Sequence, residues 1–239
     1  LIKLVIAQGT RRYAVRIDKW MSHPPDCVKP LDSIQHAREM TKAGEVGEVR
    51  LVHGHYLQDW LFLDTDYNWR LLPAEGGKLR AVADIGTHWM DTVSFILGAK
   101  ITSVFADLGT WHKTRKRPLG EVQTFAKADG AMKFASYKVA TEDFASVLLQ
   151  FNNGARGNLG VSQVAAGRKN CIRFEIYGSK KSAWWCSEEP ETLRFGNRDS
   201  MNEVAIRGTP ALGPDVAPYL DYQACPHLFD RRPRFGREQ

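Results

Sequence analysis

The chain has 239 residues, 43% of them hydrophobic and 25% charged, which is ordinary for a globular protein and excludes a disordered or fibrous one. Its net charge is +6, but its basic runs are not interleaved with aromatic residues, so we expect no nucleic-acid partner. No apolar run approaches the ~20 residues that a membrane-spanning helix requires, so we expect no membrane partner either.

The first part of the chain gives weak signals. Within residues 1–31, the apolar run 4–7 indicates one short strand, and the prolines at 24 and 25 interrupt the chain. A helix is predicted over residues 32–42, because apolar residues recur at helical spacing between a capping residue and a glycine. Residues 48–58 then alternate in hydrophobicity, as a strand does.

The middle of the chain contains its best helix. Residues 59–80 predict a long loop, and such a loop inside a compact domain is more often functional than idle. The helix is predicted over residues 82–97 and ends at Gly98. Residues 101–110 follow as a strand, and residues 112–140 are interpreted as a basic loop with no clear element.

Strands dominate the rest of the chain. Two of them flank the hairpin turn signal Asn152-Asn153-Gly154, and the full set is predicted at residues 144–151, 155–165, 171–177, 182–186 and 193–195. Helices followed by consecutive strands with short turns predict an α+β fold. We expect a large, mainly antiparallel (mixed), open-faced sheet with helices on one face.

The residues that carry chemistry lie on the predicted helix 82–97. Asp84 and His88 are four residues apart, so they share one face of that helix, beside its apolar stripe. A carboxylate next to an imidazole favours the charged ring and tunes its proton affinity near neutral pH. The pair suits general acid–base catalysis as a hydroxyl becomes a carbonyl, although spacing alone also fits a plain surface pair.

Metal binding is a second interpretation of the same region. His53 and His55 share one face of the predicted strand 48–58, and with Asp84 and His88 they form a reasonable set of zinc ligands. We expect no metal, because such an imidazole is more often a hydrogen-bonding group. The four cysteines contain no C-x-x-C pair, and their low density fits reduced thiols in a cytoplasmic protein.

A nicotinamide dinucleotide is usually held by a glycine-rich turn that follows an early strand. The G-x-G-x-x-G pattern is absent, and the only glycines before residue 76 are Gly9, Gly44, Gly47 and Gly54. We therefore expect that this chain cannot bind a dinucleotide in the usual way by itself.

From about residue 37 to about residue 207, the sequence resembles the C-terminal domain of the glucose–fructose oxidoreductase, inositol dehydrogenase and MocA (Gfo/Idh/MocA) family. The matching segments occur in the family's order: AREMTKAGEVGEVRLVHGHYLQDWL, NWR, GGKLRAVADIGTHWMD, TEDFASVLLQFNNGARG and VSQVAAGRKNCIRFEIYGSK. The resemblance implies an NAD(P)-dependent dehydrogenase, in which a Rossmann domain binds NAD or NADP. It also implies that an open-faced sheet domain binds the substrate and forms oligomers.

The resemblance also implies roles for single residues. Asp84 and His88 match the family's catalytic positions, so the histidine is implied to be the acid–base catalyst at the reacting carbinol and the aspartate to assist it. Lys29 is the implied catalytic lysine, because residues 27–30 resemble a degraded copy of the family's Glu-Lys-Pro turn.

The implied substrates are sugars, cyclitols or related polyols. Trp60, Trp69 and Arg70 are expected to line the pocket, because aromatic faces stack on sugar rings and a guanidinium offers fixed donors to hydroxyl groups. We also assign substrate binding to His55 and to Arg168, the latter toward an anionic group.

Three segments are expected: a remnant N-terminal segment at 1–31, a substrate and oligomerisation domain at 32–210, and a Pro- and Arg-rich tail at 211–239. The leading hypothesis is the substrate domain of a sugar or polyol oxidoreductase, inactive or only partly competent alone. One alternative is a non-enzymatic module that forms homo-oligomers through its open sheet face. The other is a metal-dependent enzyme that uses the histidine cluster.

Overall fold

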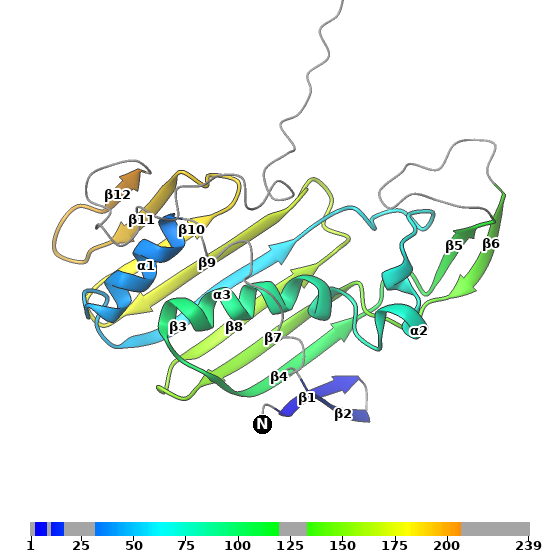
Figure 1. The fold of residues 1–239 in the computed structure, drawn as a ribbon, viewed down its shortest axis with the longest axis horizontal. Helices are drawn as coiled ribbons and strands as arrows, with labels where there is room; N and C mark the ends of the chain where they lie inside the picture. The colour runs from blue at the N-terminus through cyan, green and yellow to red at the C-terminus, as the bar shows by residue number, and fades with distance from the viewer. Residues whose placement is uncertain (1–2, 9–10, 17–31, 120–132, 207–239) are drawn as a thin grey trace, which may run out of the picture.

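The computed structural model describes residues 3–8, 11–16, 32–119 and 133–206 (Figure 1). Its main feature is a ten-stranded mixed sheet in the spatial order β12-β11-β10-β9-β3-β8-β7-β4-β1-β2, and a separate two-stranded sheet pairs β5 with β6. The strands are β1 (Lys3–Gln8), β2 (Arg11–Arg16), β3 (Val49–Leu57), β4 (Ile101–Gly109), β5 (Thr114–Pro118), β6 (Phe134–Lys138), β7 (Phe144–Phe151), β8 (Arg156–Ser162), β9 (Cys171–Gly178), β10 (Ser182–Cys186), β11 (Thr192–Gly196) and β12 (Glu203–Ile206).

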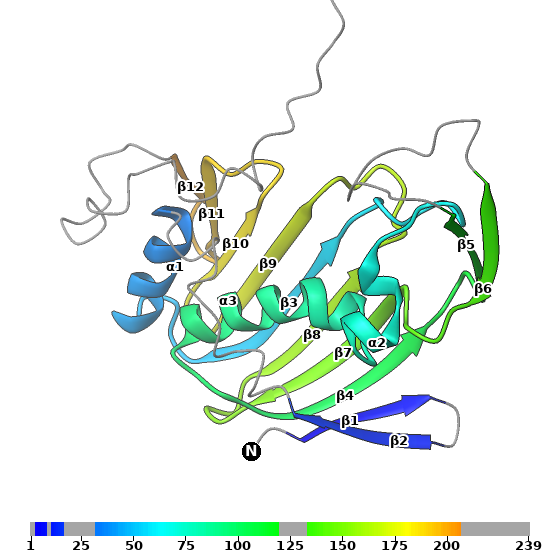
Figure 2. The ribbon, with the colours of Figure 1, turned by 45° about the vertical axis from the view of Figure 1, so that its right-hand side comes forward.

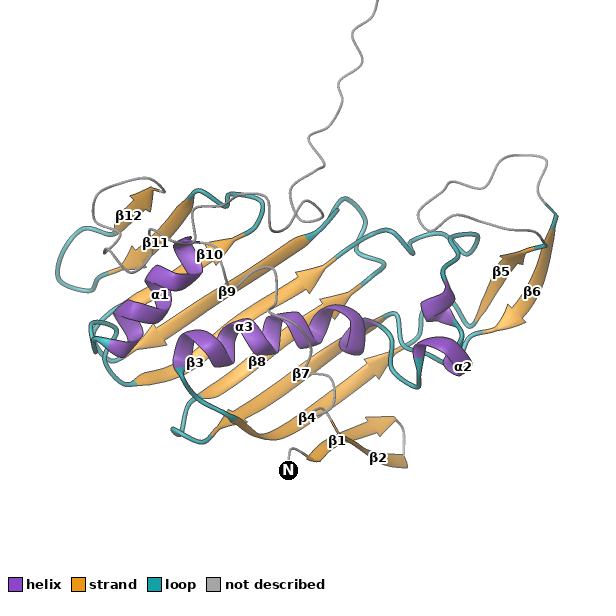
Figure 3. Ribbon diagram, in the orientation of Figure 1, coloured by secondary structure: helices purple, strands orange, loops and turns teal. Residues whose placement is uncertain are grey.

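Two helices cover one face of the large sheet. They are α1 (Asp32–Lys42) and α3 (Thr87–Leu97), and they lie side by side in front of the strands (Figures 1 and 2). Within the described ranges, no helix covers the opposite face, as the secondary-structure colours of Figure 3 show. We call this the open face; its residues include Leu51, His53, His55, Phe105, Leu148, Asn158, Cys171, Arg173, Glu175, Tyr177, Trp184 and Cys186. The predicted α+β fold, with a mixed open-faced sheet and helices on one face, is confirmed.

The core lies between the sheet and α3. Every second residue of β7 is buried, so one face of the strand meets the helices and the other faces outward. Trp89 of α3 is fully buried, and its indole N–H donates to the backbone oxygen of Arg173 at 2.7 Å. The indole approaches Gly54 of β3, where a Cβ atom would collide with Trp89 and with the Arg173 backbone. Gly54 therefore allows the helix to pack this closely.

The predicted helix over residues 82–97 ends as expected but begins differently. Gly98 adopts a left-handed conformation, with φ of 58°, and its N–H donates to the oxygen of Phe95. At the other end, η2 (Val82–Gly86) is a turn of π-helix that precedes α3. The predicted helix is present over its whole length, but its first turn is of the π type, because the N–H of Thr87 bonds to Val82, five residues back. Single π-turns are frequent at functional sites.

Two predicted loops contain short elements. The segment 59–80 holds η1 (Trp69–Leu71) and α2 (Pro73–Gly76), which are too short to show helical periodicity. The segment 112–140 holds β5 and β6, which show no alternation of apolar residues; the fully buried side chain of β5 is a charged one, Arg115. A strand that was not predicted, β12, pairs with β11.

The N-terminal segment contributes to the large sheet. The strand predicted near residues 4–7 is part of β1, which pairs with β2 and runs parallel to β4. Lys29 and the predicted tail at 211–239 lie outside the described residues. Among the described helices, none has the length and apolar character needed to cross a bilayer.

Candidate functional site

Asp84 is held at both of its carboxylate oxygens. Its Oδ1 lies 3.0 Å from Nε of Arg70, and its Oδ2 accepts a hydrogen bond from Nε2 of Gln163 at 2.8 Å. The side chains of Arg70 and Asp84 are 32% and 22% exposed, so the pair is in part accessible to a ligand. Charge-assisted bonds of this kind are strong and directional, and they keep the carboxylate in one orientation.

A buried network of charges fixes the position of Gln163. Its side-chain oxygen accepts a hydrogen bond from Nη1 of Arg80 at 3.3 Å. Arg80 forms a salt bridge with Asp143, and Asp143 accepts a second bond from Nη2 of Arg115 at 2.9 Å. The three charged side chains are fully buried. Buried ions are stable only when they are paired and hydrogen-bonded, so the three charged side chains have one stable arrangement. That arrangement holds Gln163 in place, and Gln163 in turn holds the Asp84 carboxylate.

The ionisation of this network follows from its contacts. Burial alone would raise the pKa of Asp143, but the charge and hydrogen bond of Arg80, with the bond from Arg115, hold that pKa below its ordinary value. Burial lowers the pKa of Arg80, and the charge of Asp143 opposes this change. Asp143 is therefore ionised at neutral pH, as two guanidinium partners require.

Glu142 caps the start of η2. Its Oε1 accepts hydrogen bonds from the backbone N–H groups of Arg80, at 2.8 Å, and Val82, at 3.0 Å. These two donors would otherwise lie buried without a partner at the helix start. Burial raises the pKa of Glu142 despite the hydrogen bonds that it accepts. The cap determines where the π-turn begins, and hence where Asp84 lies.

His88 lies in the first turn of α3 and is partly buried. The centre of its ring is 6.3 Å from that of Tyr56, with the two rings tilted by 54°. Its backbone oxygen accepts a hydrogen bond from the Thr92 hydroxyl at 2.8 Å. Tyr56 is a buried residue on the helix-covered face of β3. His88 and Asp84 therefore belong to the same layer of the molecule, between the helices and the sheet.

A chain of hydrogen bonds connects Tyr56 to Trp60. The side-chain oxygen of Asn170 accepts from the Tyr56 hydroxyl at 2.8 Å and from Gln58 Nε2 at 2.7 Å. The indole N–H of Trp60 donates to the side-chain oxygen of Gln58 at 2.8 Å. Trp60, a predicted substrate residue, is thus connected through the side chains of Gln58 and Asn170 to Tyr56, the neighbour of His88.

Trp69 and Arg70 lie next to Asp84. The guanidinium of Arg70 lies over the Trp69 ring, 4.6 Å from its centre, and the same guanidinium contacts Asp84. Trp69 is 43% exposed, which leaves its ring available for stacking. The structure therefore brings two of the predicted substrate-binding residues to the predicted catalytic aspartate.

The structure places His55 and Arg168 elsewhere. Both line a pocket on the open face, whereas Asp84 and His88 lie on the helix-covered face. The physical reason is strand alternation: Tyr56 points toward the helices, so its neighbour His55 points away from them. The expectation that these two residues share a pocket with Asp84 is corrected accordingly.

The four residues of the metal hypothesis are divided in the same way. His53 hydrogen-bonds Asn158 on the open face, while Asp84 and His88 lie across the sheet. In the part of the chain that the structure describes, the group of side chains close enough to share an ion is a different one, made of Cys171, Cys186 and Glu188.

Several residues that position the site were not predicted. Arg80, Glu142, Asp143 and Gln163 all lie within the segments that resemble the family, but a charged residue is interpreted as exposed unless its partner is known. The Arg80 and Asp143 partners are 63 residues apart in sequence. The alternation along residues 48–58 was the one sequence signal that could have pointed to neighbours of the site, because it puts Tyr56 and Gln58 on the face opposite His55.

Comparison with known proteins agrees with this fold. The family model of the GFO/IDH/MocA C-terminal domain matches residues 34–184. Levoglucosan dehydrogenase from Pseudarthrobacter phenanthrenivorans is 29% identical over 159 residues, which cover 66% of this chain and 40% of that relative. The chain thus spans less than half the length of this relative.

Solved structures give the same result. An oxidoreductase domain protein from Kribbella flavida aligns with a TM-score of 0.68 and 32% identity, covering 80% of this chain and 49% of that one. An inositol dehydrogenase homolog from Azotobacter vinelandii, complexed with NAD+, shares the fold with a TM-score of 0.66 at 24% identity, covering 82% and 46%. The chain therefore belongs to the GFO/IDH/MocA family of oxidoreductases and carries that family's C-terminal domain.

Proposed function

We propose that this chain supplies the substrate-binding domain of an NAD(P)-dependent sugar or polyol dehydrogenase, with Asp84 and His88 as its catalytic pair. The observation that carries the proposal is the fixed geometry of Asp84. Arg70 and Gln163 hold both of its oxygens, one helical turn before His88, within a domain of the matching family. Such a degree of positioning is characteristic of a reacting carboxylate rather than of a surface ion pair.

The chemistry assigned to this chain is proton transfer. His88 takes the proton of the substrate hydroxyl, and the negative charge of Asp84 favours the resulting imidazolium. Oxidation of the carbinol itself needs a nicotinamide, and the described residues do not fit a dinucleotide. No described strand leads through a glycine-rich turn into a helix N-terminus. The dinucleotide is therefore assigned to a separate Rossmann domain.

The substrate class follows from the exposed groups and from the relatives. Trp69 offers a ring face, Arg70 offers hydrogen-bond donors, and Trp60 lies on the network that reaches Tyr56, the ring beside His88. Levoglucosan dehydrogenase has been solved in complex with NADH and L-sorbose, and it aligns with this chain at 25% identity with a TM-score of 0.62. A cyclic sugar or polyol is therefore the proposed substrate of this chain.

Binding of polyols to the chain tests this proposal. We expect saturable binding of at least one of levoglucosan, myo-inositol and L-sorbose by ligand-detected NMR. Arg70→Ala is expected to weaken it about tenfold, in line with the loss of a hydrogen bond to a charged group. Arg156→Ala, an exposed arginine at the start of β8, is the matched control and should bind as the parent does. Absence of binding across the panel, or equal binding by Arg70→Ala, contradicts the proposal.

A specific observation also supports a second function, association of copies of this chain through the open face. Phe105 of β4 and Leu148 of β7 are direct cross-strand partners, and they are 52% and 56% exposed. Paired apolar side chains on the uncovered face of a sheet are characteristic of a protein interface. We propose that a second copy of the chain covers them, whether or not the domain is catalytically competent.

A further inference from the structure

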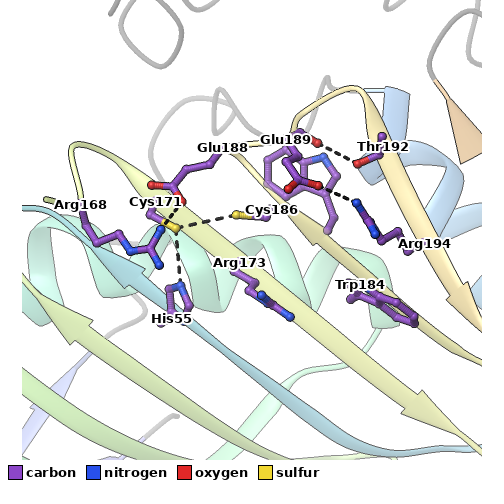
Figure 4. Close-up of a pocket in the computed structure, with 11 residues that line it drawn as sticks. His55, Arg168, Cys171, Arg173, Trp184, Cys186, Glu188, Glu189, Thr192 and Arg194 are labelled. Atoms are coloured by element: carbon purple, nitrogen blue, oxygen red, sulfur yellow. Dashed lines mark hydrogen bonds and ion pairs between the residues drawn. The ribbon is translucent and has the colours of Figure 1, made fainter. Parts of the chain in front are cut away.

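The open face carries a pocket of about 410 Å³ where β3, β9 and β10 lie together. Two cysteines, a histidine and a glutamate meet at this pocket, as Figure 4 shows. Cys171 begins β9, Cys186 ends β10, Glu188 follows in the next turn, and His55 comes from β3. These residues have no part in the proposed catalytic chemistry, because the sheet separates them from Asp84.

Two of the distances between these side chains match those around a tetrahedral metal ion, and Cys171, Cys186 and Glu188 are the three whose ligand atoms all lie within 4.8 Å of one another. The sulfur of Cys171 is 3.8 Å from the sulfur of Cys186 and 3.5 Å from Nε2 of His55. Zinc bonds of about 2.3 Å to sulfur and about 2.05 Å to nitrogen, at tetrahedral angles, separate two sulfurs by about 3.8 Å and sulfur from nitrogen by about 3.5 Å. A carboxylate oxygen of Glu188 lies within 4.8 Å of both sulfurs.

A disulfide fits these two cysteines less well. In the ladder between β9 and β10, Cys186 lies opposite Arg173, so Cys171 is two positions away on the diagonal. Diagonal neighbours in an antiparallel pair have Cα atoms about 7–8 Å apart, whereas a disulfide joins Cα atoms at about 4.4–6.8 Å. The strand register therefore favours an ion between the sulfurs over a bond between them.

Nearby arginines balance the charge of the site. Glu188 forms a salt bridge with Arg168, and Arg173 also lines the pocket (Figure 4). Two thiolates and a carboxylate around a divalent cation leave one net negative charge, which these guanidinium groups offset. Partners that neutralise and orient the ligands from outside are a regular part of metal sites.

We propose that Cys171, Cys186 and Glu188 bind one thiophilic divalent cation, with zinc as the natural ion, and that His55, which contacts the Cys171 sulfur, turns toward the ion as the fourth ligand. Binding releases the protons of both thiols to solvent and forms two metal–sulfur bonds. The ion connects β3, the start of β9 and the turn after β10, so its role is structural. This inference does not depend on the proposed catalytic function.

Titration of the purified, reduced chain with Co2+ tests the site. We expect an intense thiolate-to-cobalt absorption band that saturates at one equivalent, together with the visible bands of a tetrahedral ion, and displacement of both by Zn2+. Cys171→Ser and Cys186→Ser should lose the charge-transfer band or lower its intensity, and Glu188→Gln should weaken binding at least about tenfold. Glu189→Gln is the matched control, since its carboxylate pairs with Arg194 instead.

The remaining cysteines make the result decisive. Cys27 and Cys225 lie outside the described residues. A Cys27→Ser/Cys225→Ser chain therefore keeps, of its four cysteines, only the two that are proposed as ligands, and it should bind cobalt like the parent. Loss of binding in that double variant, an absent thiolate band in the parent, or unchanged binding in Glu188→Gln overturns the proposal. So does a Cys171–Cys186 disulfide found by peptide mass spectrometry in the purified chain. Circular dichroism of each variant separates lost ligation from lost folding.

Discussion

At the scale of the residue, the candidate site depends on charges that lie beneath the surface. Asp143 is paired with two buried guanidinium groups, whereas Glu142 accepts only backbone hydrogen bonds through one of its oxygens. Asp143→Asn removes a charge and leaves two buried cations without a counter-ion, which is expected to destabilise the fold by about 3–5 kcal/mol. Glu142→Gln keeps the accepting oxygen, so its expected effect at neutral pH is below about 1 kcal/mol. Urea unfolding followed by circular dichroism measures the free energy of unfolding of both variants. Equal losses of stability would contradict the roles assigned to Asp143 and Glu142.

The raised pKa of Glu142 gives a pH dependence of stability. Because burial raises that pKa above 4.5, the folded chain favours the protonated carboxyl. Its contribution to stability is complete below pH 4.5 and is lost as the pH rises through the folded-state pKa. Glutamine mimics the neutral form at every pH, so the stability of Glu142→Gln relative to the parent should increase between pH 4 and pH 7. Urea midpoints at a series of pH values measure this, and a constant difference would show that Glu142 is not desolvated.

The residues that could be predicted from sequence are those with a local pattern. Asp84 and His88 are four positions apart on one helical segment, so their spacing makes them candidates, and the family resemblance adds the catalytic role. Gln163 could not be selected, because its importance comes from Arg80 and Asp84, which lie 83 and 79 positions away. His55 was misplaced because its residue type suited a substrate site, while alternation along β3 sends it to the other face.

At the scale of the element, the contact between α3 and β3 depends on a missing side chain. Gly54→Ala would place a methyl group against the Arg173 backbone and the Trp89 indole, neither of which has room to move. We expect a loss of about 1–3 kcal/mol, as is usual for overpacking. Gly160→Ala is the matched control on the neighbouring strand β8, where the nearest atom to the new methyl group is 3.7 Å away. Thermal unfolding compares the two variants, and equal melting temperatures would show that the packing of α3 on β3 does not require a glycine at position 54.

Elements with a strong period were predicted well, and elements defined by tertiary contacts were not. The alternation of β7 and β8 around a hairpin turn, and the apolar stripe of α3, are visible in sequence because one face of each is buried. The π-turn at η2 depends on Glu142, which is distant in sequence and caps its N-terminus. β5 escaped prediction because Arg115 takes the place of an apolar residue and finds its partners in another segment.

At the scale of the whole molecule, the sheet separates two sets of functional groups. The helix-covered face holds Asp84 and His88, and the open face holds the proposed metal site. The open face is itself divided, because β9 and β10 present charged groups and cysteines, whereas β4 and β7 present the apolar pair Phe105 and Leu148. In the strand order, β3 and β8 lie between these two parts. A metal that stiffens one part of the face can therefore leave the other free to form an interface.

The apolar part of the open face gives the last prediction. A charge on Phe105 or Leu148 would be buried without a partner if a second copy of the chain covers them, so Phe105→Asp/Leu148→Asp is expected to dissociate the oligomer. Light scattering after size-exclusion chromatography should show the parent as an oligomer and the double variant as a folded monomer. Met201→Asp is the matched control, since Met201 is 89% exposed in the turn between β11 and β12, away from this pair. A monomeric parent at micromolar concentration, or dissociation by Met201→Asp alone, would show that the open face is not the interface.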